Sequence, residues 1–178
     1  NLEAAVIELA SGTRVWRSNL APQSIVDLRW SRDGRHLAAL VGTAKGKRLA
    51  LFAWPSGAAV TLSEALRSLP VEALEWGAET DALYVIAAEN GERRVRRLML
   101  NAARPPATVI DGAVSAFTYD PTTARLVYAK PGHPRLWALA ADGQSQELPI
   151  AVPRAIPADQ WQLIGERLYQ ADLSAGLP

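Results

Sequence analysis

Residues Ile25 to Leu62 read IVDLRWSRDGRHLAALVGTAKGKRLALFAWPSGAAVTL, and the pattern of this segment indicates the fold class. It contains four short runs of mostly apolar residues, which are Ile25–Trp30, His36–Val41, Arg48–Trp54 and Ala58–Leu62. The separator after the first run ends in Asp33-Gly34, a strong signal for a tight β-hairpin. The stretch therefore predicts a sheet of four antiparallel strands that are joined by short turns.

A spaced pair of residues repeats along the chain: an aromatic residue is followed seven positions later by leucine. The pairs are Trp30 with Leu37, Trp76 with Leu83, Tyr119 with Leu126 and Trp161 with Leu168. Successive aromatic residues are 46, 43 and 42 positions apart. A period in the low forties with short strands inside each unit is typical of β-propeller blades. We predict that the eight residues occupy equivalent positions on first and second strands and face the adjacent blades.

The repeat also predicts the organisation of the chain as one all-β domain. Its units are a half blade at 4–17, full blades at 25–62, 71–110 and 114–148, and a half blade at 161–171. The first half blade matches third and fourth strands and the last matches first and second strands, which gives about four blade equivalents. Such a chain closes on itself, forms part of a larger ring, or pairs its end strands with a second chain as a homodimer. Helix is expected only in places such as Ser63–Leu69.

Composition excludes several classes of protein. The 178 residues are 49% hydrophobic and 21% charged, which is typical of a globular domain. A net charge of +1 gives no bulk attraction to nucleic acid, so we expect no direct contact with it. No stretch is apolar for long enough to span a bilayer. The chain begins with Asn1 rather than Met, so we expect a domain or processed product whose signal peptide or anchor lies outside it.

Catalytic and metal-binding patterns are missing from the sequence. It has no cysteine, which excludes disulfides and thiolate nucleophiles, and it has no Gly-x-Ser-x-Gly motif. Its two histidines, His36 and His133, are expected to be an ordinary strand residue and a loop residue, and no pair of them has metal-ligand spacing. Most aspartates stand where turns favour them. We therefore expect no cofactor, no metal and no enzymatic activity.

Leu28–Ala38, which reads LRWSRDGRHLA, resembles the repeat of TolB-type β-propellers. That repeat reads roughly as an aromatic residue, Ser-Pro-Asp-Gly and then Leu-Ala, and Arg32 stands here in place of the proline. The run Trp161–Tyr169, WQLIGERLY, is similar to segments in the propeller-bearing sensory regions of CadC-like winged-helix regulators. The second resemblance implies the periplasmic part of a bacterial membrane-bound transcriptional regulator. The expected function is thus a non-enzymatic binding or sensor domain. The alternative is the propeller of a prolyl-oligopeptidase-type serine peptidase, which gates a separate catalytic domain.

Basic residues follow the predicted second strand in all three full units. The candidate site residues are Lys45, Lys47 and Arg48, then Arg93 and Arg94, then His133 and Arg135. Equivalent loops of a propeller emerge on one face, so we predict that these groups converge there and bind a protein partner or a small anionic ligand. The competing interpretation is that they are solvated strand ends, balanced by Glu89 and Glu92.

The six tryptophans are expected mainly in the core. Trp30, Trp76 and Trp161 lie in the register of the repeat, and Trp54 and Trp137 fall on predicted third strands. We predict that these five fill the layers between blades. Trp16 lies outside the register and is the weakest candidate for the core.

Overall fold

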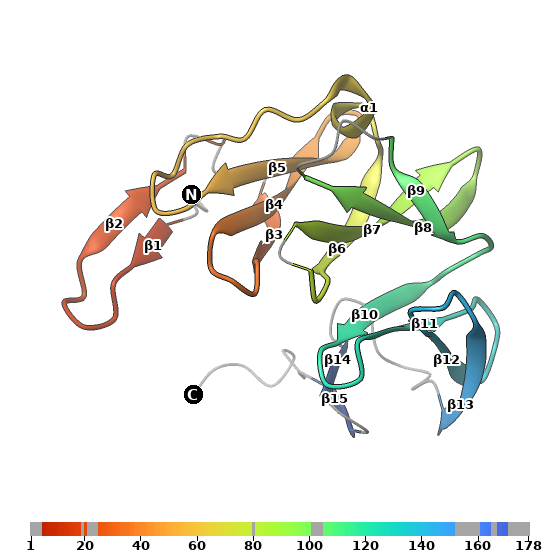
Figure 1. Cartoon of the computed structure of the whole chain (residues 1–178). Coiled ribbons are helices and arrows are strands. Elements are labelled where there is room, and N and C mark those ends of the chain that lie inside the picture. The colour runs from red at the N-terminus through yellow and green to blue at the C-terminus, as the bar shows by residue number, and fades with distance from the viewer. Residues whose placement is uncertain are drawn as a thin grey trace.

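The structure, a computed structural model, is a series of small antiparallel sheets that follow one another along the chain (Figure 1). It describes residues 5–18, 20, 25–79, 81–100 and 105–151, together with the backbone of 161–164 and 167–170. The ends of the predicted half blades, residues 4 and 171, and the predicted turn at 165–166 lie outside the described residues. Within the described part, one four-residue helix accompanies the strands.

Three sheets form the body of the molecule, and each is a meander in which neighbouring strands are consecutive in the sequence. The first blade contains β3 (Ile25–Trp30), β4 (His36–Thr43) and β5 (Gly46–Ala53). The second contains β6 (Val71–Trp76), β7 (Ala82–Glu89), β8 (Glu92–Met99) and β9 (Ala107–Ile110). The third contains β10 (Ala116–Asp120), β11 (Arg125–Ala129), β12 (Arg135–Leu139) and β13 (Ser145–Ala151).

Two hairpins flank these blades. The first hairpin pairs β1 (Ala5–Ile7) with β2 (Arg14–Arg17), and the last hairpin pairs β14 (Trp161–Ile164) with β15 (Arg167–Gln170). The first strands of successive units contact one another: β3 contacts β6, β6 contacts β10, and β10 contacts β14. This succession of first strands is the arrangement of propeller blades around an axis, so the predicted all-β propeller fold is confirmed.

The predicted equivalence of the aromatic and leucine positions holds in the three blades, where the two residues of each pair lie opposite one another. Trp30 lies opposite Leu37, Trp76 opposite Leu83 and Tyr119 opposite Leu126. The prediction is wrong for the last hairpin, where Trp161 lies opposite Gln170 and Leu168 lies opposite Leu163. Because Ile164 already pairs with Arg167, the turn between these strands is shorter than the turns between first and second strands in the blades. The residue opposite Leu168 is therefore Leu163, two positions after Trp161. The side chains of 161–170 lie outside the described residues.

The layers between blades hold the core. The largest cluster combines residues of β4 and β5 with residues of β6, β7 and β8, among them the buried Leu40, Leu51, Leu74 and Leu83. A second cluster joins the second and third blades through residues such as Ile86, Val95 and Tyr119. Blades thus bury their faces against each other, as alternating strand residues require.

The predicted fourth strand of the first blade, Ala58–Leu62, is reduced to a single bridge between Phe52 and Ala59. The chain then leaves the sheet and enters α1 (Glu64–Arg67), whose N-cap Ser63 accepts a hydrogen bond from the Leu66 N–H. Leu62, Leu66 and Leu69 are buried in the cluster between the first two blades. Burial of these leucines outweighs continued pairing with β5, and the first blade has three strands instead of four.

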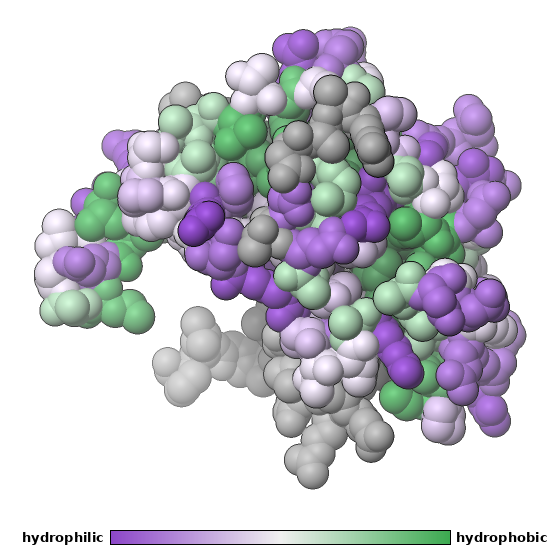
Figure 2. All heavy atoms as spheres, in the orientation of Figure 1, coloured by the Kyte–Doolittle hydropathy of each residue, from purple (hydrophilic) through white to green (hydrophobic). Residues whose placement is uncertain are grey.

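Two of the predicted tryptophan positions need correction. Trp30 is 42% exposed, and its ring meets that of Trp54 edge-on with centroids 5.5 Å apart. Trp16, in contrast, packs on Phe52 with ring centroids 5.0 Å apart and donates from Nε1 to the Gly57 carbonyl at 3.2 Å. Other apolar side chains of the first hairpin, such as Leu9, stay on the surface (Figure 2).

The described strands do not close a ring. β1–β2 and β14–β15 form separate two-stranded sheets, and no sheet in the described part joins one to the other. The self-closed form of the chain is therefore not the observed one.

Candidate functional site

The seven candidate residues lie at corresponding places in the three blades, where a second strand passes into a third. Lys45 is in the turn between β4 and β5, and Lys47 and Arg48 lie on β5. Arg93 and Arg94 occupy β8, His133 precedes β12, and Arg135 begins β12. Each group lies in or just after a tight reversal that contains a glycine at positive φ, which is Gly46, Gly91 or Gly132.

Three of the arginines are neutralised by carboxylates close by. Arg93 pairs with Glu72 at 2.7 Å and Arg135 pairs with Glu147 at 3.1 Å. Arg94 pairs with Glu92 at 2.6 Å and with Asp111 at 3.3 Å. The hydrogen bond that Arg94 donates to the Glu92 carboxylate and the charge of Asp111 hold the pKa of Arg94 above its ordinary value. For Arg93, Arg94 and Arg135, these pairs agree with the interpretation that the basic residues are solvated strand ends balanced by carboxylates.

The remaining cations gather at the beginning of β5. Lys47 reaches across to the second blade, where Nζ donates to the Glu72 carbonyl at 3.4 Å. Glu72 therefore contacts both cations: its main-chain carbonyl accepts from Lys47, and its carboxylate pairs with Arg93. Among the described residues, neither Lys45 nor Arg48 has an ion pair. We call Lys45, Lys47 and Arg48 the basic edge.

His133 belongs to a separate aromatic cluster on the third blade. Its ring meets Trp137 edge-on with centroids 5.6 Å apart, and Lys130 Nζ lies 3.3 Å from the centroid of the Trp137 ring. The lysine is thus held by a cation–π contact. None of these contacts joins His133 to the basic edge.

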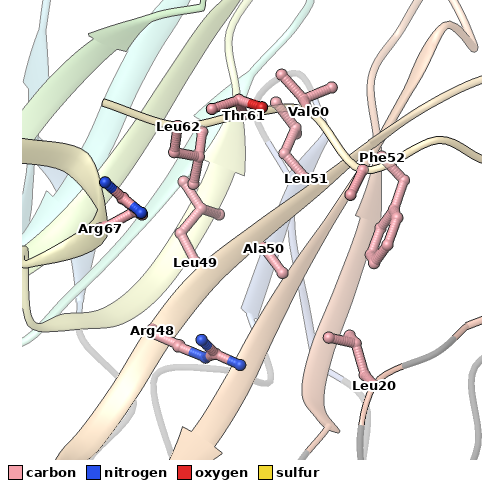
Figure 3. A pocket seen from close by; sticks show the side chains of 11 residues that line it. Leu20, Arg48, Leu49, Ala50, Leu51, Phe52, Val60, Thr61, Leu62 and Arg67 are labelled. Atoms are coloured by element: carbon pink, nitrogen blue, oxygen red, sulfur yellow. The ribbon is translucent and has the colours of Figure 1, made fainter. Parts of the chain in front are cut away.

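A groove of about 320 Å³ runs along β5 from Arg48 to Phe52, between this strand and the segment 59–62 that leaves the sheet (Figure 3). Leu49 and Leu62 line one side of it, and Phe52 and Leu20 line the other. Arg48 and Arg67 are its charged lining residues, and no acidic side chain lines it. Arg67 is paired with Glu64 at 2.6 Å, whereas no carboxylate of the described residues neutralises Arg48. The groove is apolar, with a basic end.

One local signal in the chain points to this groove, although the repeat pattern obscures it. Ser63 followed by Glu64 begins a helix, and a helix so soon after Ala58 leaves little length for a fourth strand. Only the three-dimensional arrangement shows that Leu20, from the segment before β3, forms part of the same groove.

A second hollow, of about 440 Å³, lies between the second and third blades. Tyr84 and Tyr119 line it and stack with ring centroids 5.9 Å apart. Burial raises the pKa of the Tyr84 phenol above its ordinary value, so this group stays protonated. Arg97, the cation that lines this hollow, pairs with Glu79. This hollow therefore offers no free charge to an anionic ligand.

A charged cluster on the first strands was not singled out from the sequence. Arg29 on β3 lies 3.3 Å from the Asp27 carboxylate and 3.8 Å from that of Glu75 on β6. Burial raises the pKa of Glu75 to about 7, although Arg29 opposes the shift. The described residues contain no group of His, Cys, Asp and Glu that could hold a metal ion. No helix in that part is long and apolar enough to cross a membrane.

Comparisons with known proteins bear on the fold. No family model matches the chain, and no curated protein is similar to it in sequence. Among solved structures, TolB from Acinetobacter baumannii superposes with a TM-score of 0.55 at 17% identity, over 74% of this chain and 34% of that one. The fold is that of a TolB-like β-propeller. A putative TolB from Agrobacterium tumefaciens gives a TM-score of 0.53 at 11% identity, over 68% of this chain and 49% of that one.

A chain in a crystal structure of the mitotic checkpoint complex is also similar, with a TM-score of 0.56 and 12% identity over 81% of this chain and 43% of that one. The chain thus spans less than half the length of each of these solved chains. At such identities the likeness concerns the fold, and the basic edge and its groove are features of this chain's own residues.

Proposed function

We propose that this chain is a non-enzymatic, partner-binding propeller domain that receives an anionic protein segment at the basic edge. The observation that carries the proposal is the contrast within the seven candidate residues. Arg93, Arg94 and Arg135 are neutralised, while no carboxylate in the part of the chain that the structure describes pairs with Lys45 or Arg48, and Arg48 borders an apolar groove. A free cation beside apolar surface suits a partner that combines a carboxylate with apolar side chains.

The biological setting that we propose is the periplasm, with the chain serving as the sensor part of a membrane-bound bacterial transcriptional regulator. The similarity of Trp161–Tyr169 to regulator sensory regions supports this setting. The coding region around the chain tests it directly. A winged-helix domain and one membrane span upstream are expected, and an α/β-hydrolase domain downstream would instead favour the propeller of a serine peptidase.

Binding at the basic edge is tested with a labelled poly-glutamate peptide at low and at physiological ionic strength. The chain should bind the peptide, and binding should weaken with salt because the cations are exposed. The double variant Lys47→Glu/Arg48→Glu should abolish binding without altering the thermal midpoint greatly. Arg125→Glu, an exposed cation on β11 away from the groove, is the matched control and should bind like the parent chain. Equal binding by the double variant and the parent would refute the proposal.

A further inference from the structure

β5 has one fully paired side and one side that is mostly open. It pairs with β4 from Gly46 to Ala53. On its other side, the Ala53 N–H donates to the Ala58 carbonyl and the Val60 N–H donates to the Leu51 carbonyl, both at 2.8 Å. After these two bonds the chain turns away toward α1. The first part of β5 therefore faces the groove instead of a neighbouring strand.

The alternation of an antiparallel strand identifies the backbone groups that face the groove. Successive residues direct their N–H and C=O groups to opposite sides of the strand. Leu51 and Ala53 bond on the open side, so Leu49 and Lys47 direct their groups to that side as well. Within the described chain no backbone partner meets Leu49 or Lys47 there, and the Leu51 N–H also lacks one. These backbone groups can form the hydrogen bonds of an additional antiparallel strand.

The outer strands of the other two blades are protected in ways that β5 is not. β9 has only four residues, and β13 carries Glu147 and Pro149. A short strand, a charge and a proline each discourage pairing with another chain. β5, in contrast, is eight residues long, has no proline, and carries charges of one sign only, Lys47 and Arg48, which an acidic segment can neutralise. An edge of this kind accepts an extended segment of opposite charge.

We propose that β5 binds an extended, acidic segment of a partner protein, which completes the first blade as its fourth strand. The proposal rests on the proposed function and deepens it by fixing the conformation of the partner. An acidic residue opposite Arg48 matches the uncompensated cation of the groove. The next residue of the segment faces the opposite side, where Leu49 and Leu62 line the groove, and is apolar.

Selection from a displayed library of random short peptides against the 178-residue chain tests the sequence part of the proposal. The selected peptides should be enriched in an acidic residue next to an apolar, β-branched one. Replacing alternate backbone N–H groups of a selected peptide by N-methyl should reduce its affinity at least about tenfold, since each methyl removes a ladder bond. Selected peptides without acidic residues, an absence of selected peptides, or full binding after N-methylation would each overturn the proposal.

Two substitutions at one position separate strand addition from charge attraction. Lys47→Gln removes the charge and keeps the N–H, whereas Lys47→Pro removes both and places a ring on the open edge. Neither change disturbs the core, because Lys47 is exposed, and proline is tolerated on an edge where its missing N–H was unpaired. A selected peptide should bind Lys47→Pro at least about tenfold more weakly than Lys47→Gln. Equal binding would refute strand addition while leaving the proposed anionic partner in place, and binding insensitive to Lys47→Glu/Arg48→Glu would refute both.

Amide hydrogen exchange in the unmodified chain gives a second measurement that does not depend on a variant. The Leu49 N–H faces the groove, whereas the Ala50 N–H faces β4 and serves as an internal control. Addition of a selected peptide should slow exchange at Leu49 by about tenfold or more and leave Ala50 almost unchanged. Protection that is absent at Leu49 when the peptide is bound would show that the peptide does not add to this edge.

Discussion

The indole Nε1 of Trp76 donates a 2.9 Å hydrogen bond to the main-chain carbonyl of Arg29, and this bond ties the first strand of the second blade to that of the first. The same indole stacks on His36 with ring centroids 6.1 Å apart. Trp76 is only 4% exposed. One side chain thus fills the layer between two blades and also satisfies a polar group within it.

Trp76→Ala should lower the free energy of unfolding by about 3–5 kcal/mol, because it opens a cavity between blades. Trp76→Phe keeps an aromatic ring but loses the hydrogen bond, and should cost about 1–2 kcal/mol. Trp30→Ala is the matched control at the equivalent position of the first blade. Since Trp30 is 42% exposed, its loss should cost about 1–2 kcal/mol. Chemical denaturation measures all three, and equal losses for Trp76→Ala and Trp30→Ala would contradict the assigned packing.

Gly57→Ala should detach the first hairpin from the first blade. Gly57 has φ of +65°, and a Cβ there would overlap the indole of Trp16. Gly34→Ala is the control, because Gly34 has φ of +69° and open space around it. Both changes carry the cost of about 1–2 kcal/mol for a left-handed alanine, but only Gly57→Ala displaces Trp16. Limited proteolysis should therefore cut 5–17 faster in Gly57→Ala alone. Similar cleavage of both variants would exclude this contact as the anchor of the hairpin.

Arg32 is expected to stabilise three blades together. Its Nε donates to the Gly77 carbonyl at 3.1 Å, and its guanidinium lies 5.3 Å from the centroid of the Tyr119 ring. Arg32→Ala should lower the free energy of unfolding by about 1–2 kcal/mol. Arg35→Ala, in the same turn, removes a side chain that is 79% exposed and should cost under about 0.5 kcal/mol. If urea unfolding gives the same midpoint for both variants, Arg32 does not link the blades.

Glu75 should make the stability depend on pH. Its pKa is raised from 4.5 to about 7 by burial, so the folded chain holds a proton that the unfolded chain releases between these values. The free energy of unfolding should therefore fall as pH rises from about 4.5 to about 7, by up to about 3 kcal/mol, and should stay level above that range. Glu75→Gln should remove this decline, whereas Glu64→Gln, on exposed α1, should keep it. An unchanged pH profile in Glu75→Gln would show that Glu75 has an ordinary pKa.

The hairpins of the three blades were predictable because local signals agree there. Trp76 and Leu83 are joined by a short turn whose length sets their pairing, and tight turns of similar length recur in the other blades. The last hairpin departs from the pattern because spacing along the sequence fixes pairing only when the turn length is constant. The missing fourth strand reflects a tertiary competition: Leu62 and Leu66 gain more burial between blades than beside β5.

The strand positions of the basic residues were also predictable, but the carboxylates with which they form ion pairs were not. Glu72 lies on β6, Asp111 follows β9 and Glu147 lies on β13, each distant in sequence from the arginine that it neutralises. Sequence proximity suggested Glu89 and Glu92 as the balancing carboxylates, and of these only Glu92 pairs with one of the candidate arginines, while Glu89 pairs with Arg96. Only once these long-range pairs are known does it emerge that Lys45 and Arg48 have no ion pair among the described residues.

β7 supplies side chains to both of the large clusters. Leu83 and Val85 belong to the cluster shared with the first blade, whereas Ile86 belongs to the cluster shared with the third blade and Tyr84 packs against it. A slip of β7 by a single residue would exchange its two faces and disrupt both interfaces at once. The register of this one strand of eight residues therefore sets how all three blades align with one another.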